Sequence, residues 1–182
     1  RHWMNNLVLS IFPGIDLLGR AFEEQGWCVV RGPDVIWGGD IRAFHPPAGV
    51  FDGIIGGDPC QSHSALADLV RHNGHEPKFP DMSPEFRRVV EEARPRWYVR
   101  ENVPGAPLIT PDGYDCWQTL LVDAHVGGLQ LRERRISLGL REGLWADSLR
   151  SPMTLIEYGE GTESMAANLG CDSGIAYEEK RR

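Results

Sequence analysis

Short apolar blocks, most of them ended by glycine, proline or a polar cluster, recur along this chain of 182 residues. Blocks of four to eight apolar residues with such ends are typical of buried β-strands. They predict strands at Leu7–Ile11, Trp27–Val30, Val50–Ile55, Trp97–Asn102 and Arg135–Leu138.

Between these blocks the apolar residues are spaced as on one face of a helix. This spacing predicts helices over Ile15–Gln25, Ser83–Ala93 and Tyr114–Ala124. In the second of these, Ser83 is the expected N-cap and Pro84 the first helical residue. Strands that alternate with helices favour an α/β fold with a mostly parallel sheet.

Composition narrows the class of protein further. Hydrophobic residues make up 41% and charged residues 25% of the chain, as in one globular domain with its own core. No apolar run reaches the ~20 residues that span a bilayer, and the first residues lack a signal-peptide pattern. We therefore expect a cytoplasmic protein with no membrane partner.

Four scattered cysteines form no paired spacing, which predicts neither a metal site nor a disulfide framework. Cys28 and Cys116 lie in apolar segments and are expected in the core. Cys60 differs, because Pro59-Cys60-Gln61 directly follows a predicted strand. Open α/β sheets bind ligands at the carboxyl ends of their strands, where a thiolate could act as a nucleophile.

Two later segments carry further candidate chemistry. Glu101 ends a predicted strand and is followed by Asn102-Val103. In Gln130-x-Arg132-x-Arg134 the two arginines are two residues apart, so on a strand they share one face.

These three segments, in this order, resemble the motifs of the cytosine-C5 DNA methyltransferases. The resemblance implies that Cys60, followed by Gln61, adds to C6 of cytosine and that Glu101 assists at N3. It also implies that Arg134 contacts the base, with Arg132 supporting the site. The substrate would be a cytosine flipped out of DNA.

The same resemblance implies a Rossmann-like methyltransferase fold and S-adenosylmethionine as cofactor. A glycine between strand and helix lets a ligand approach the backbone, and a carboxylate after the next strand suits a ribose diol. The cofactor site would comprise Phe12, Gly14, Ile15, Asp16, Asp34, Asp40, Ile41 and Pro59. The chain departs from the family pattern at Asp16, where a second glycine is usual, and at Asp58, where the family has proline or an apolar residue.

The resemblance covers about residues 7 to 157, which predicts a catalytic domain at 1–157 and an extension at 158–182. Few residues separate Gly139 from Arg150, so the fold would be shortened and lack a large target-recognition domain, as in compact phage-type members. In that case the protein would lie in the host cytoplasm. A net charge of −7 predicts DNA binding that weakens steeply as salt rises.

Two other functions stay open on the sequence. One is methylation of cytosine in RNA, because a tRNA-methylating branch shares the same catalytic motifs. The other is a non-catalytic module that binds the cofactor or DNA, which Asp16 and Asp58 would favour.

Overall fold

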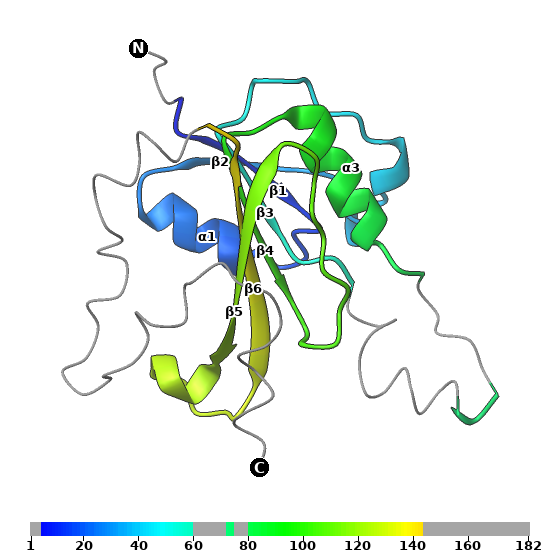
Figure 1. Ribbon diagram of the computed structural model, residues 1–182, viewed down its shortest axis with the longest axis vertical. Coiled ribbons are helices and arrows are strands. Elements are labelled where there is room, and N and C mark those ends of the chain that lie inside the picture. The colour runs from blue at the N-terminus through cyan, green and yellow to red at the C-terminus, as the bar shows by residue number, and fades with distance from the viewer. Residues whose placement is uncertain (1–4, 60–71, 75–79, 144–182) are drawn as a thin grey trace.

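The computed structural model describes residues 5–59, 72–74 and 80–143. Six strands form one sheet in the order β2-β1-β3-β4-β6-β5, with helices on both faces (Figure 1). Strands β1 to β4 pair in parallel, whereas β6 runs antiparallel to both of its neighbours. The prediction of a Rossmann-like, mostly parallel α/β fold is confirmed.

Most predicted elements lie where the apolar pattern placed them. The strands are β1 at Leu7–Ile11, β2 at Cys28–Arg31, β3 at Gly53–Gly56 and β4 at Trp97–Asn102. The helices are α1 at Leu17–Glu24 and α3 at Ser83–Ala93. Short 3-10 helices follow β2 at Val35–Trp37 and Ile41–Ala43.

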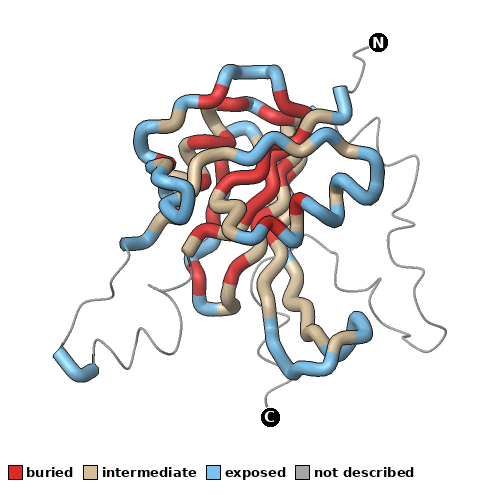
Figure 2. Tube along the Cα trace, turned by 180° about the vertical axis from the view of Figure 1, so that it is seen from behind, coloured by how far each residue is buried: buried red, intermediate tan, exposed pale blue. Residues whose placement is uncertain are grey.

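The helix predicted over Tyr114–Ala124 is wrong. Tyr114–Val122 is strand β5, which pairs along its whole length with β6, Glu133–Arg141. A 3-10 helix at Asp123–Val126 and a turn join the two strands, and this hairpin extends from the buried centre of the sheet (Figure 2). Thr119, Val122 and the aromatic Trp117 suit a strand, and pairing with β6 outweighs the helical spacing of the apolar residues.

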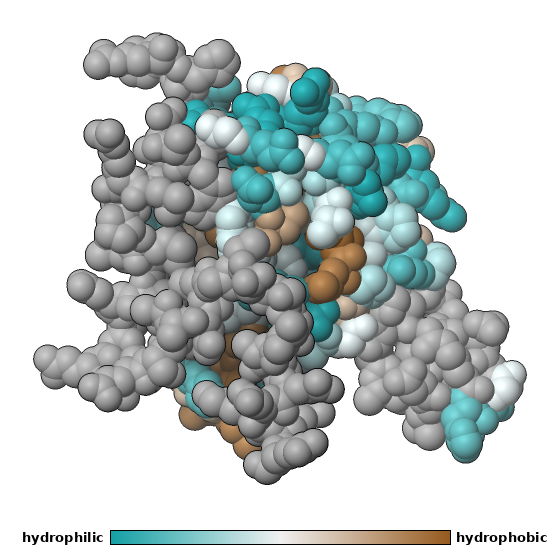
Figure 3. All heavy atoms as spheres, in the orientation of Figure 1, coloured by the Kyte–Doolittle hydropathy of each residue, from teal (hydrophilic) through white to brown (hydrophobic). Residues whose placement is uncertain are grey.

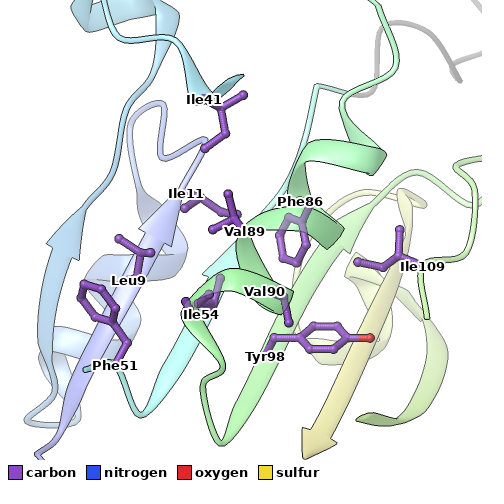
Figure 4. Packing of buried hydrophobic residues seen from close by; sticks show 11 residues of the cluster. Leu9, Ile11, Ile41, Phe51, Ile54, Phe86, Val89, Val90, Tyr98 and Ile109 are labelled. Carbon is purple, nitrogen blue, oxygen red and sulfur yellow. The ribbon is translucent and has the colours of Figure 1, made fainter. Parts of the chain in front are cut away.

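The main core lies between the sheet and α3 (Figure 4). Leu9, Ile11 and Ile54 point from the strands toward Phe86 and Val89 of α3, and all are fully buried. Burial of each such side chain contributes about 1.5–3 kcal/mol. This packing explains why α3 forms as the spacing predicts.

Aromatic rings pack on the other face of the sheet, beneath α1. Phe22 stacks on Trp97 with ring centroids 5.5 Å apart, and Trp27 meets Trp97 edge-on at 5.5 Å. Gly53 of β3 lies under the Trp97 ring, where a Cβ atom would collide with it. A glycine inside a strand is therefore required here for close packing.

Three smaller predictions need correction. Cys28 is exposed on β2 rather than buried, and Cys116 is only half-buried, with its Sγ 3.0 Å from Tyr98 Oη. Burial, followed by this hydrogen bond, raises the pKa of Tyr98. Ser83 does not cap α3, because its hydroxyl donates instead to Asp58 at 2.9 Å.

The outer face of α3 is charged, and the surface over this helix is mostly hydrophilic (Figure 3). Arg87 pairs with Glu91 at 2.7 Å, and Arg88 pairs with Glu85 at 2.8 Å. Within the described ranges there is no helix suited to crossing a membrane. The same ranges hold no cluster of three or more histidine, cysteine or acidic side chains fit for a metal ion.

Candidate functional site

The carboxyl ends of β1, β3 and β4 lie side by side, because these strands are parallel neighbours. The chain moves from β1 outward to β2 and then returns to β3 on the other side of β1. Such a reversal leaves a crevice at the strand ends, where open α/β sheets bind ligands. The predicted cofactor and catalytic residues follow these strands.

One hydrogen bond joins the loop after β1 to the turn after β2. The Gly14 N–H donates to Asp34 Oδ2 at 2.9 Å, while Asp34 Oδ1 accepts the Ile36 N–H at 2.8 Å. Gly14 has a φ of +52°, and apart from its two chain neighbours no atom of the described residues lies within 4 Å of where its side chain would begin. An open glycine beside a carboxylate with free lone pairs fits a ligand that carries hydroxyl groups.

Asp16, the departure from the second glycine, has a structural role in this loop. It lies in the left-handed region at φ 55° and caps α1 by accepting the Gly19 N–H at 3.0 Å. Its Oδ1 also accepts the Ser10 hydroxyl at 2.8 Å, and its Oδ2 lies 2.8 Å from Arg31 Nε. Asp16 therefore joins the end of β1, the start of α1 and the end of β2.

This arrangement predicts an unusual response to Gly19→Ala. Alanine inside a helix usually stabilises it by about 1 kcal/mol relative to glycine. Here a Cβ atom at position 19 would collide with the Asp16 carboxylate. We expect a loss of about 1–3 kcal/mol in the free energy of unfolding, measured by urea denaturation. With Asp16→Gly in place, the same substitution should no longer destabilise; an equal loss there would contradict the assignment.

The Gly-Asp-Ile segment is less open to a ligand. The Asp40 carboxylate is already bound to Arg42, two residues further along. Arg42 Nη2 lies 2.7 Å from Asp40 Oδ2, and the Arg42 main-chain N–H donates to Oδ1 at 3.0 Å. These hydrogen bonds lower the pKa of Asp40. Ile41 is buried in the core beside α3, whereas Ile15 is 85% exposed and Phe12 is half-buried.

A cleft of about 190 Å³ lies at the ends of β3, β4 and β6. Its lining includes Gly57, Pro59, Glu101, Asn102, Arg132 and Arg134. Residues more than seventy positions apart in the sequence are thereby brought to one place. Cys60 and Gln61 lie outside the described residues, but Pro59, which directly precedes them, lines this cleft.

Glu101 and Arg134 form an ion pair across the cleft. Arg134 Nε lies 2.7 Å from Glu101 Oε1, which leaves Oε2 directed over Gly57. Arg132 precedes β6 rather than belonging to it, yet it lines the same cleft. A guanidinium and a carboxylate side by side provide both a donor and an acceptor for a polar ring.

The close contact between Gly57 and Glu101 gives a second prediction. A Cβ atom at position 57 would lie 2.8 Å from the Glu101 carbonyl oxygen and 2.9 Å from Oε2. Gly57→Ala should therefore displace the Glu101 carboxylate and lower the kcat of the reaction that takes place in this cleft by about 10²-fold. Steady-state kinetics would measure this, with Arg87→Met, which breaks an exposed ion pair on α3, as the control. Unchanged turnover in a folded Gly57→Ala protein would contradict it.

Two features of this region escaped the sequence reasoning. Asp58 and Arg100 form a buried ion pair directly beneath the cleft, with Arg100 Nη2 2.8 Å from Asp58 Oδ2. Arg135 Nη1 donates to the Ala106 carbonyl at 2.6 Å and holds the loop after β4. A charged residue inside an otherwise buried strand, such as Arg100 in β4, was the available signal.

Comparison with known proteins shows that much of the chain is similar to cytosine-C5 DNA methyltransferases. A family model described as C-5 cytosine-specific DNA methylase matches residues 37–165. The type II methyltransferase M.FnuDI of Fusobacterium nucleatum is 29% identical over 82% of this chain and 51% of its own length. M.NgoPII of Neisseria gonorrhoeae is 25% identical over 75% and 48%, respectively. The chain spans about half the length of the curated relatives it matches.

Solved structures agree on the fold. A protein described as a DNA modification methyltransferase encoded within an E. coli prophage superposes with a TM-score of 0.54 at 20% identity. The match covers 76% of this chain and 47% of that one. A DNMT2 mutant of Spodoptera frugiperda superposes with a TM-score of 0.51 at 18% identity, over 76% and 50% of the two chains.

Proposed function

This chain belongs to the C-5 cytosine-specific DNA methylase family, and from that premise we propose that it transfers a methyl group to C5 of cytosine in DNA. The observation that carries the proposal is the cleft in which Glu101, Arg132 and Arg134 converge on Pro59, one residue before Cys60. The carboxylate and guanidinium groups of this cleft, together with the thiol of Cys60 that comes next in the sequence, match what this reaction needs.

Cytosine C5 is a weak nucleophile until a group adds to C6. The Cys60 thiolate makes this addition, because sulfur both attacks and later leaves readily. Glu101 donates a hydrogen bond at N3, where negative charge builds as the C6–S bond forms. Arg134 orients the base and holds Glu101, with Arg132 and Gln61 in support. Once C5 has accepted the methyl group, loss of the C5 proton expels the thiolate and restores the ring.

The proposed cofactor site lies beside this cleft, at the carboxyl ends of β1 and β2. S-adenosylmethionine, when bound, supplies the methyl group that C5 accepts. Gly14 would let it approach the backbone, and Asp34 would accept hydrogen bonds from ribose hydroxyls. Asp40 would accept a hydrogen bond from the adenine amine, and Phe12, Ile15 and Pro59 would contribute apolar surface, with Ile41 supporting them from the core. Asp16 acts on the cofactor through the loop that it caps.

The DNA partner imposes its own requirement. A cytosine inside a duplex is out of reach, so the base is flipped into the cleft or taken from a single strand.

Residues 1–157 would form the catalytic domain and 158–182 an extension of it. Because the net charge is −7, phosphate binding rests on local arginines such as Arg132 and Arg134, and it weakens as salt rises.

A trapping experiment tests the proposal. The protein is incubated with S-adenosylmethionine and DNA that contains 5-fluorocytosine, whose fluorine cannot leave as the C5 proton does. We expect a covalent protein–DNA complex on a denaturing gel, formed only with cofactor present. An adduct with matched RNA alone would favour the RNA-directed function. No adduct with either, together with measurable cofactor binding, would favour a non-catalytic module.

A further inference from the structure

Asp58 and Arg100 form an ion pair that is removed from solvent. The Asp58 side chain is 0% exposed and that of Arg100 is 1% exposed. Arg100 Nε lies 2.5 Å from Asp58 Oδ1, and Nη2 lies 2.8 Å from Oδ2, so the guanidinium holds both carboxylate oxygens. A pair with this bidentate geometry is directional as well as strong.

Further hydrogen bonds connect the pair to α3, to the loop after β4 and to the end of β4 itself. Ser83, the first residue of α3, donates its hydroxyl to Asp58 Oδ2 at 2.9 Å and contacts Arg100 Nη2 at 2.7 Å. Arg100 Nη1 donates to the Pro107 carbonyl at 2.6 Å, in the loop after β4. Asn102 Nδ2 donates to the Asp58 main-chain carbonyl at 3.2 Å. These contacts leave the pair few alternative positions.

The pair lies directly behind the cleft. Side chains alternate along β4, so Arg100 and Asn102 are buried on the core face while Glu101 lies between them on the other face. Just after β3, Asp58 stands between Gly57 and Pro59, and all three residues line the cleft, although the Asp58 side chain is closed off from solvent. The ion pair therefore joins the two strand ends that present Glu101 and lead into Cys60.

We propose that Arg100 and Asp58 are positioning residues, which hold the ends of β3 and β4 in the register that methyl transfer requires. This inference rests on the proposed function of the cleft. Asp58 stands where the family pattern has proline or an apolar residue. In this chain a buried ion pair therefore takes the place of apolar packing. Neither residue touches the substrate; they act through Pro59 and Glu101.

Three variants test the pair as a unit: Asp58→Asn, Arg100→Met and the double substitution. Each single variant leaves one partner buried without its counter-charge, which disrupts the site more than loss of both. We expect each single variant to lower kcat by about 10²-fold, with little change in the KM for DNA or for S-adenosylmethionine. The double variant should lose no more than the worse single variant. Arg87→Met, which breaks an exposed ion pair on α3, is the matched control.

Amide hydrogen exchange gives a readout that does not depend on activity. In the single variants we expect about 10-fold faster exchange across residues 53–58 and 97–103, and no change there in Arg87→Met. If a single variant does not fold, Arg100→Lys can replace it. Lysine keeps the positive charge but cannot bind both Asp58 oxygens at once, so kcat and amide exchange should change in the same direction to a smaller degree.

The outcomes separate the two proposals. Wild-type protein without methyl transfer or adduct would refute the proposed function, and exchange would still decide whether the pair holds the strand ends. Active wild-type protein with folded variants of unchanged kcat would overturn the positioning role. Exchange at the strand ends equal to that of the control would overturn it as well.

Discussion

Cys60→Ser should abolish methyl transfer. We expect kcat to fall by on the order of 10⁴-fold or more, as is typical when an enzyme loses its covalent nucleophile. A serine hydroxyl is far less acidic than a thiol, so it does not add to C6 at neutral pH. Binding of S-adenosylmethionine should stay nearly unchanged, because the cofactor site that we propose is built from other residues. Transfer of a labelled methyl group to DNA measures the first effect, and calorimetric titration the second.

Cys28→Ser is the matched control for this experiment. Cys28 is exposed and begins β2, where it pairs in register with Leu7 at the amino ends of the strands, away from the cleft. Its substitution should leave methyl transfer unchanged. Full activity in Cys60→Ser would show that the nucleophile is another residue, or that the reaction needs none.

Glu101→Gln should lower kcat for methyl transfer by about 10³-fold, since the amide keeps the shape of the side chain but cannot share a proton with N3. Arg134→Met should act similarly, because Arg134 holds Glu101 Oε1 at 2.7 Å. The double variant is expected to lose little more than the worse single variant, since the two side chains act as a unit. Single-turnover kinetics with saturating cofactor would isolate the chemical step.

Glu91→Gln supplies a comparison with the same chemical change. Glu91 pairs with Arg87 on α3, far from the cleft, and its substitution should leave turnover unaffected. If the Glu101 and Arg134 effects simply multiplied in the double variant, the two residues would be acting independently. Their ion pair would then have no part in catalysis.

The apolar pattern by itself determined much of the fold. The strands β1 and β4 and the helix α3 lie at the predicted residues, because each buries one apolar face against a neighbour. The order of motifs also placed Glu101, Arg132 and Arg134 in one site, and the cleft brings them together. Glu101 reaches the cleft because parallel strands end at the same edge of a sheet, and Arg132 and Arg134 reach it because the antiparallel strand β6 begins at that edge.

Local spacing failed at Tyr114–Val122, which forms a strand although its apolar residues suit a helix. Nothing within those nine residues shows the partner strand β6, which begins eleven positions later and supplies the hydrogen bonds. A short apolar segment can adopt either form, and long-range pairing decides between them.

The ion pairs were decided by tertiary structure alone. Asp58 looked like an unfavourable departure beside Cys60, yet Arg100, 42 positions away in sequence, binds both of its oxygens. Asp16 likewise looked like a lost glycine, yet it caps α1 and accepts the Ser10 hydroxyl. Sequence shows that a charge is present, but its energy depends on which partner the fold places beside it. A buried carboxylate is costly alone and acceptable only when paired and hydrogen-bonded.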